Sequence, residues 1–178
     1  MRAPLLVLVG PPASGKTTVG TAVAGRLGAV FRDTDHDIED LAGCSVADLF
    51  VTEGEAHFRA LEEQAVAVAL ASHDGVLALG GGAVTSAATR ELLVGYGRDG
   101  GTVVWLDVDL PSAARRVGLS RDRPILGINP RAMLRHMLEM RAPLYDEVAT
   151  LTVSTGGRKP AEVVADVLAA LSTSPAGR

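Results

Sequence analysis

A glycine-rich stretch near the N-terminus has the residue types and spacing of a phosphate-binding loop. Residues 10–17 read GPPASGKT, which fits the pattern of glycine, four residues, glycine, lysine and serine or threonine. An apolar run, residues 5–9, precedes this stretch, and a helix-like run, residues 18–27, follows it. The glycines allow the backbone to curl around a polyphosphate with its N–H groups pointing inward, and the positive end of the next helix faces the same point. A simple glycine-rich turn is the alternative interpretation.

The side chains of this loop suit a nucleoside triphosphate with its magnesium ion. Lys16 can reach the β- and γ-phosphates as a point charge, which makes it a candidate catalytic residue. The hydroxyl of Thr17 is placed to ligate the Mg²⁺ that accompanies ATP. The nucleotide contacts predicted here are Gly10, Ala13, Ser14, Gly15, Lys16, Thr17 and Thr18.

Two aspartates follow a short apolar run one element further along the chain. Asp33 and Asp35 are two residues apart, so in an extended segment both carboxylates would lie on one side. Asp33 is a candidate metal ligand through a water molecule, and Asp35 is a candidate acceptor for a hydroxyl proton. Because the pKa of an unperturbed aspartate is about 3.9, Asp35 should mainly orient the nucleophile and take the proton late in transfer. A solvated loop with a helix-capping aspartate is the alternative.

A glycine triplet follows another predicted strand. Gly80, Gly81 and Gly82 would let the backbone approach a ligand closely and offer it N–H groups. A flexible turn is the simpler interpretation. The triplet is nevertheless a candidate substrate-binding element, because it leaves the sheet at the same edge as the phosphate-binding loop.

Three arginines are candidates for binding anionic groups. Arg59 lies in a helix predicted to begin near Glu55, and Arg141 ends a helix predicted to begin at Pro130. Taken singly, each is more often a surface charge. Arg123 lies in a polar loop rich in glycine and proline, residues 118–130, which suits a mobile lid that brings a cation onto the transferring phosphate.

A further aspartate competes for the metal role. Residues 103–107, VVWLD, form an apolar run that ends in Asp107, as in a Walker B strand. We favour a structural role for Asp107 at the strand end, because Asp33 competes for the metal.

The elements that must position these residues alternate along the chain. Predicted strands span residues 5–9, 29–31, 76–79, 103–107 and 151–153, and predicted helices span residues 17–27, a short segment capped by Ser45, 54–71, 86–94, 111–117, 130–141 and 160–171. Short continuous apolar strands alternating with helices indicate a parallel sheet covered on both faces. Ligands bind such sheets at the carboxyl ends of the strands. The phosphate-binding loop, the segment with Asp33 and Asp35, and the glycine triplet all follow predicted strands at that edge. The tail, residues 172–178, is expected to be disordered.

Composition narrows the class of protein. The 178 residues suit one domain, and 47% hydrophobic with 21% charged residues is ordinary for a soluble globular chain. A net charge of -4 and 3% aromatic residues argue against nucleic-acid binding. One cysteine, Cys44, suits a reducing compartment, and no apolar run is long enough for a membrane span, so we expect a cytoplasmic protein. The low aromatic content gives no sign of a large interface and favours a monomer.

Taken together, these motifs resemble those of shikimate kinases. The resemblance covers residues 5–171 and is carried by the loop ending in Gly15-Lys16-Thr17, the pair in Asp33-Thr34-Asp35, Phe58-Arg59, Gly80-Gly81-Gly82, Arg123-Pro124 and Arg141-Ala142-Pro143-Leu144-Tyr145. A phosphate loop alone would mark only a very large superfamily, whereas this combination in this order is far more selective.

The resemblance implies a fold, a reaction and a site. The fold is an α/β three-layer α/β/α P-loop kinase of the nucleoside monophosphate kinase type, with a five-stranded parallel sheet, a lid loop and substrate-binding helices. The reaction is transfer of the ATP γ-phosphate to the 3-hydroxyl of shikimate, with Mg²⁺. In the family's pattern, Asp35 holds the acceptor hydroxyls. In the same pattern, the carboxylate of shikimate is held by Arg59 and Arg141, with help from the backbone at Gly81.

The same pattern implies nucleotide contacts outside the phosphate loop. Arg123 acts from the lid on the phosphates, and Arg116 and Arg158 fall where the family contacts the nucleotide. Ala13 departs from the glycine of many phosphate loops, which we expect to be tolerated if its φ is negative. Residues 155–157, TGG, replace a more polar stretch near the adenine, so contacts there should come from the backbone.

Two other functions remain open from the sequence alone. The first is a kinase for another small polyol acid or cyclitol, such as gluconate, and the paired arginines disfavour only a neutral cyclitol. The second is a nucleotide-binding regulatory protein that does not turn over a metabolite. Asp35 and the two arginines together argue against this second alternative.

Overall fold

Five parallel strands form the centre of the molecule. The computed structural model describes residues 3–118 and 129–173. The strands are β1 (Leu6–Val9), β2 (Phe31–Asp33), β3 (Val76–Ala78), β4 (Val103–Asp107) and β5 (Leu151–Ser154), in the order β2-β3-β1-β4-β5. All pairings are parallel, with Leu6 opposite Val76 and Val7 opposite Val103. Because β1 lies in the middle, the loop that follows it emerges at the centre of the carboxyl edge.

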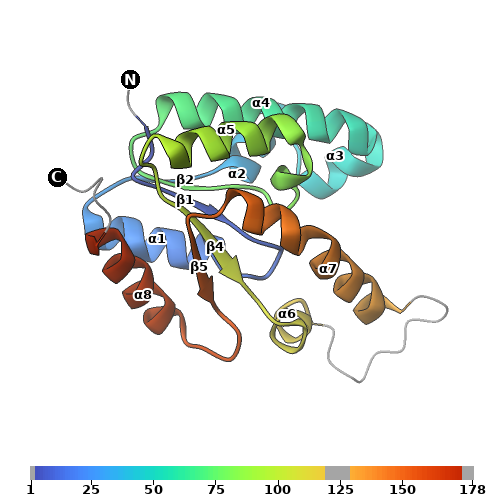
Figure 1. The fold of residues 1–178 in the computed structure, drawn as a ribbon. Coiled ribbons are helices and arrows are strands. Elements are labelled where there is room, and N and C mark those ends of the chain that lie inside the picture. The colour runs from blue at the N-terminus through green and yellow to red at the C-terminus, as the bar shows by residue number, and fades with distance from the viewer. Residues whose placement is uncertain (1–2, 119–128, 174–178) are drawn as a thin grey trace.

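Helices cover both faces of this sheet (Figure 1). Helices α1 (Lys16–Leu27) and α8 (Pro160–Thr173) pack on one face, and α4 (Gly54–Ser72), α5 (Ala87–Arg98) and α7 (Pro130–Val148) pack on the other. Successive side chains of β1 alternate between the two cores, since Leu6 and Leu8 join α1 and α8 while Val7 and Val9 join the opposite helices. The expected three-layer α/β/α fold with a five-stranded parallel sheet is confirmed.

Shorter helices complete the carboxyl edge. Helices α2 (Thr34–Ala42) and α3 (Val46–Thr52) pack against α4 through a separate apolar cluster built on Ile38, Leu49 and Phe58. The 3-10 helix η1 (Ala83–Thr85) follows the glycine triplet, and α6 (Leu110–Arg116) follows β4. The side chain of Ser45 caps α3 by accepting from the Asp48 N–H, as its position predicted.

Four boundary predictions are wrong, among them the end of α5, which lies at Arg98 rather than at residue 94. The second strand is Phe31–Asp33 rather than residues 29–31, because Asp33 pairs in register with Ala78 and its side chain then caps α2 by accepting from the Asp35 N–H. Asp35 therefore lies in the first turn of a helix and not in an extended segment.

Helix α7 runs on past Pro143 to Val148, so Arg141 does not end it. The buried side chains of Tyr145 and Val148 hold the last turns on the sheet despite the hydrogen bond that proline removes. Helix α8 likewise includes residues 172 and 173 of the tail that was expected to be disordered, and residues 174–178 lie outside the described part of the chain. Within the described ranges, no helix is both long enough and apolar enough to cross a membrane.

Candidate active site

The phosphate-binding loop lies between β1 and α1. Gly10 and Gly15 have φ values of 149° and 97°, which residues with side chains rarely adopt. The Lys16 ammonium folds back over the loop and donates to the carbonyls of Gly10, at 2.7 Å, and Pro11, at 3.1 Å. The loop is therefore preformed, with its cation held over the ring of backbone groups that would surround a phosphate.

The backbone at Ala13 differs from the expected conformation. Its φ is 64°, so the condition of a negative φ is not met. A left-handed alanine costs about 1 kcal/mol relative to glycine. The Ala13 carbonyl accepts a hydrogen bond from Arg116 at 2.9 Å, which helps to fix this conformation.

Burial sets the protonation behaviour of Lys16. Removal of the ammonium from water lowers the pKa of Lys16 to about 8, although Asp35 and Asp33 oppose this shift. The lysine consequently changes charge in a pH range that can be reached experimentally.

The two candidate metal ligands contact each other. The Thr17 hydroxyl donates to Asp33 Oδ2 at 3.1 Å. A hydroxyl and a carboxylate are oxygen ligands of the kind Mg²⁺ prefers, so this pair fits the ion that a triphosphate carries. No group of three or more His, Cys, Asp and Glu side chains that could hold a metal occurs among the described residues. Any magnesium here therefore depends on phosphate oxygens as well.

Two carboxylates lie against the first glycine of the triplet. A Cβ built on Gly80 would overlap both Asp35 Oδ1 and Glu62 Oε1, and both of these buried oxygens lack a hydrogen-bond partner. Burial raises the pKa of Asp35 above its ordinary value, and the charge of Asp33 adds to this rise. Burial also raises the pKa of Glu62, which its hydrogen bond with Arg59 opposes. A hydroxyl donor entering here would meet two unsatisfied acceptors.

Arg59 is held in place by acidic and aromatic neighbours. It pairs with the buried Glu62 one turn along α4 and, at 3.3 Å, with the exposed Glu55. Its guanidinium also lies over the rings of Phe50 and Phe58, 5.7 and 5.3 Å from their centroids. These contacts orient a cation beside the glycine triplet, where a Cβ on Gly82 would overlap it.

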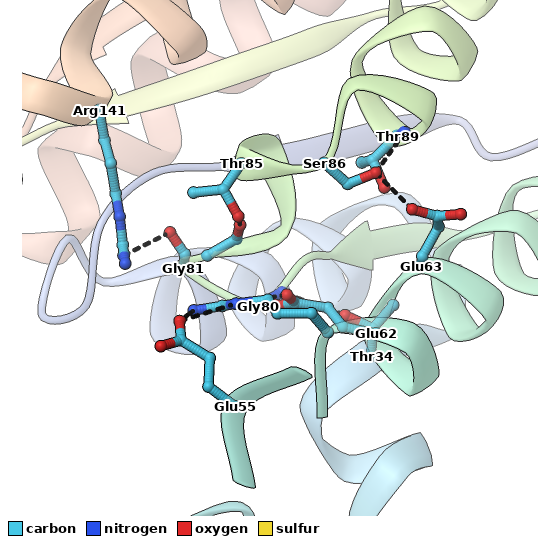
Figure 2. Close-up of polar contacts among 12 residues, drawn as sticks. Thr34, Glu55, Glu62, Glu63, Gly80, Gly81, Thr85, Ser86, Thr89 and Arg141 are labelled. Atoms are coloured by element: carbon cyan, nitrogen blue, oxygen red, sulfur yellow. Dashed lines mark hydrogen bonds and ion pairs between the residues drawn. The ribbon is translucent and has the colours of Figure 1, made fainter. Parts of the chain in front are cut away.

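Helix α7 supplies a second cation from the opposite side of the triplet. Arg141 Nη1 donates to the Gly81 carbonyl at 3.1 Å, and Figure 2 shows this contact on one side of the triplet with Glu55 and Glu62 on the other. The Tyr145 hydroxyl donates to the same carbonyl at 2.6 Å. Gly81 itself packs on Pro12 of the phosphate loop, where a Cβ would come within 2.7 Å of the proline Cδ. The triplet therefore joins the phosphate loop to both arginines.

A cavity lies beside the phosphate loop. It has a volume of about 290 Å³ and is lined by Ser14, Gly15, Thr18, Val19, Arg115, Arg116, Thr155, Gly157, Arg158, Lys159, Pro160 and Val163. Arg116 crosses it to donate to Thr155 O at 2.7 Å, while Arg158 pairs with Asp166 at 2.8 Å. Arg116 and Arg158, which the resemblance assigned to the nucleotide, therefore line one cavity beside the loop.

One sequence-based candidate, Asp107, lies apart from this arrangement. Asp107 lines a different cavity, together with Trp105 and Arg135, and Asp33 is the carboxylate bonded to Thr17. Arg123 and most of the predicted lid, residues 119–128, lie outside the described part of the chain.

Sequence reasoning missed the contributions of Glu62, Tyr145 and Thr34. Glu62 lies three residues after Arg59 and Tyr145 four after Arg141, spacings that place side chains together on a helix. That spacing could have identified both as partners of the arginines. The role of Thr34, whose hydroxyl accepts from the Gly80 N–H at 3.1 Å, depends on contact between distant elements and had no local signal.

This combination defines a class of enzyme. A phosphate loop beside a separate group of carboxylates and arginines, at the carboxyl edge of one parallel sheet, is the site of a P-loop phosphotransferase acting on a small molecule.

Comparison with known proteins gives the family within that class. The family model described as shikimate kinase matches residues 12–172. A shikimate kinase of Salinispora arenicola is 58% identical over 96% of this chain and 99% of its own length, and one of Streptomyces coelicolor is 51% identical over 99% and 100%. The solved shikimate kinase from Acinetobacter baumannii in complex with shikimate has a TM-score of 0.85 at 35% identity, covering 98% of this chain and 96% of that one. The chain belongs to the shikimate kinase family.

Proposed function

We propose that this protein transfers the γ-phosphoryl group of ATP to the 3-hydroxyl of shikimate, giving shikimate 3-phosphate for aromatic amino acid biosynthesis. The observation that carries the proposal is the convergence of Asp35, Arg59 and Arg141 on the glycine triplet beside the phosphate loop, in a chain of the shikimate kinase family. The gluconate or cyclitol alternative lacks comparable support from the family matches. A non-catalytic nucleotide switch would have no use for the acceptor groups.

The donor half holds the triphosphate. Backbone N–H groups of residues 10–17 and the N-terminus of α1 surround the phosphates, and Lys16 leaves its loop carbonyls to bind the β- and γ-phosphates. Arg116 and Arg158 line the nucleotide cavity. The resemblance gives Arg123, outside the described residues, the role of a further cation for the phosphates.

Thr17 and Asp33 would hold the magnesium ion that accompanies the triphosphate. The hydrogen-bonded hydroxyl and carboxylate of these residues supply oxygen ligands, directly or through water. The ion supplies positive charge against the phosphate oxygens.

The acceptor half holds the carboxylate of shikimate between two arginines. A guanidinium presents a planar pair of donors that matches a carboxylate. The contacts of Arg59 with Glu55 are long, at 3.3 and 3.4 Å, and Glu55 is exposed, so a substrate carboxylate replaces Glu55 at low cost. Arg141 approaches from the other side, and Gly80, Gly81 and Gly82 bring backbone between the two arginines.

Asp35 orients the reacting hydroxyl. Its unpartnered Oδ1 accepts the hydrogen bond of the ring hydroxyl and aligns the oxygen lone pair with the γ-phosphorus. The raised pKa of Asp35, caused chiefly by burial, brings its basicity closer to what proton capture late in transfer requires.

We also propose the domain organisation, the oligomeric state and the cellular location of the protein. One domain spanning the chain is supported by the single sheet that carries both halves of the site. The lone cysteine favours the cytoplasm, and the low aromatic content favours a monomer.

The carboxylate clamp is tested by pairing a variant with a substrate analogue. Arg59→Ala should weaken shikimate binding about ten- to a hundredfold, because a charge-assisted hydrogen bond contributes roughly 1.5 to 3 kcal/mol. The methyl ester of shikimate should show a similar loss with the unchanged protein. Calorimetric titrations should find that the two losses do not add, because both remove the same interaction.

Arg32→Ala is the matched control, since Arg32 also forms an ion pair, with Asp37, at a similar exposure. This control should bind shikimate normally. Full additivity of the two losses, or unchanged affinity in a folded Arg59→Ala protein, would show that Arg59 does not hold the carboxylate.

A further inference from the structure

Each peptide unit of the glycine triplet is fixed by a partner. The Gly80 N–H donates to the buried Thr34 hydroxyl at 3.1 Å, and the Gly80 carbonyl accepts from the Ala83 N–H at 3.1 Å. The Gly81 carbonyl accepts from Tyr145 at 2.6 Å and from Arg141 at 3.1 Å. Hydroxyl groups from α2 and α7 therefore hold the backbone of the glycine triplet.

The Gly81 N–H remains available to a ligand. No hydrogen bond within residues 3–118 and 129–173 uses the Gly81 N–H. Its peptide partner, the Gly80 carbonyl, is bonded to Ala83, and the two groups of a trans peptide point in opposite directions. The orientation of the Gly81 N–H is thus set by its neighbours and not by a partner of its own.

Substrate binding should affect the two donors to the Gly81 carbonyl differently. Arg141 is only half-buried and is needed for the substrate carboxylate in the proposed function. Tyr145 is 1% exposed, and its ring is stacked on Trp105 with 5.7 Å between centroids. Burial raises the pKa of Tyr145 to about 12, so its hydroxyl remains a donor throughout the working pH range. Only the tyrosine can hold the carbonyl before and after the substrate binds.

We propose that Tyr145 is a positioning residue: its hydroxyl holds the Gly81 carbonyl and so fixes the peptide between Gly81 and Gly82, which frees Arg141 to bind the acceptor carboxylate. This inference rests on the proposed function. It gives the acceptor site a side chain that does not touch the substrate but holds the Gly81 carbonyl when Arg141 leaves it.

The chain provides a matched control for the test. It has two tyrosines, and the other, Tyr96, also donates its hydroxyl to a backbone carbonyl, that of Pro4, at 2.8 Å. Burial raises the pKa of Tyr96 as well. Tyr96 lies beside a cavity formed with Pro4 and Gly101, away from the glycine triplet. Tyr145→Phe and Tyr96→Phe therefore remove similar bonds, of which only one is at the site.

Steady-state kinetics gives the first readout. Tyr145→Phe should raise KM for shikimate about three- to tenfold, as expected for one neutral hydrogen bond, with kcat and KM for ATP within twofold of the unchanged protein. Tyr96→Phe should leave all three constants within twofold. Unchanged KM for shikimate in Tyr145→Phe, or an equal rise in Tyr96→Phe, would overturn the proposal.

The Gly82 amide, which shares a peptide with the Gly81 carbonyl, gives a second readout that needs neither turnover nor substrate. In Tyr145→Phe the Gly82 cross-peak of the free protein should shift or broaden, while Tyr96→Phe should leave it in place. An unchanged Gly82 cross-peak in Tyr145→Phe would overturn the positioning role even if shikimate binds. A protein that shows the expected cross-peak changes but does not bind shikimate would instead contradict the proposed function.

Discussion

Asp35→Asn should lower kcat roughly 10²- to 10⁴-fold while leaving ATP affinity nearly unchanged. The amide keeps the shape of the side chain but cannot take the hydroxyl proton, and it can present its NH₂ group to the nucleophile. ATP affinity persists because the phosphates are held by residues 10–17, whose backbone contacts do not involve Asp35. A coupled ADP-release assay and calorimetric titration of ATP measure the two quantities.

The same variant should be more stable than the unchanged protein at neutral pH. The folded-state pKa of Asp35 is raised by burial and by Asp33, so the folded protein binds this proton more tightly than the unfolded chain. Stability therefore falls as pH rises from about 4, the unfolded pKa, through the higher folded pKa. Thermal unfolding should give a higher Tm for Asp35→Asn at pH 8, and the difference should shrink toward pH 4.

Asp37→Asn is the matched control on the same helix, because Asp37 pairs with Arg32 away from the site. It should keep kcat within twofold and should not raise Tm. Loss of ATP binding in Asp35→Asn would point instead to a metal or structural role for Asp35.

Lys16→Met should lower kcat roughly 10²- to 10³-fold, the effect of removing one donor to the charge that develops during phosphoryl transfer. Shikimate should still bind, since its clamp is built from Arg59, Arg141 and the triplet. Rates at saturating ATP and shikimate measure the first effect, and shikimate titration measures the second.

The pH dependence of ATP binding isolates the lysine. In the free protein the pKa of Lys16 is lowered to about 8 by burial, and a bound triphosphate favours the charged form. ATP affinity should therefore decline as pH rises above about 8, where binding requires uptake of a proton. Lys16→Met should lose this decline, and a decline that persists in the variant would contradict the assignment of the titrating group to Lys16.

Local signals predicted the donor half of the site well. The loop of residues 10–17 combines glycines, lysine and threonine at fixed spacing, and the adjoining apolar run is buried on both sides as β1. The sheet followed from the same logic, since four predicted strands match observed strands closely. The second strand was misplaced because Arg32 and Asp33 are polar and lie in β2 only through pairing with β3.

The acceptor half depends more on contacts between distant elements. Arg59, Gly81 and Arg141 were predicted through resemblance, yet nothing local shows that Pro12 packs on Gly81 or that Thr34 and Tyr145 hold the triplet. The positive φ of Ala13 was also not predictable, because the loop imposes it against the residue's own preference.

The identity of the acceptor can be measured directly by comparing ADP release with different acceptors. Purified protein with ATP and Mg²⁺ should be assayed for ADP release with shikimate, gluconate and a panel of cyclitols, each with and without the metal, and the product with shikimate should be analysed for the phosphorylated hydroxyl. We expect ADP release only when shikimate and magnesium are both present, with the phosphate on the 3-hydroxyl. Turnover with another acceptor and none with shikimate would contradict this expectation.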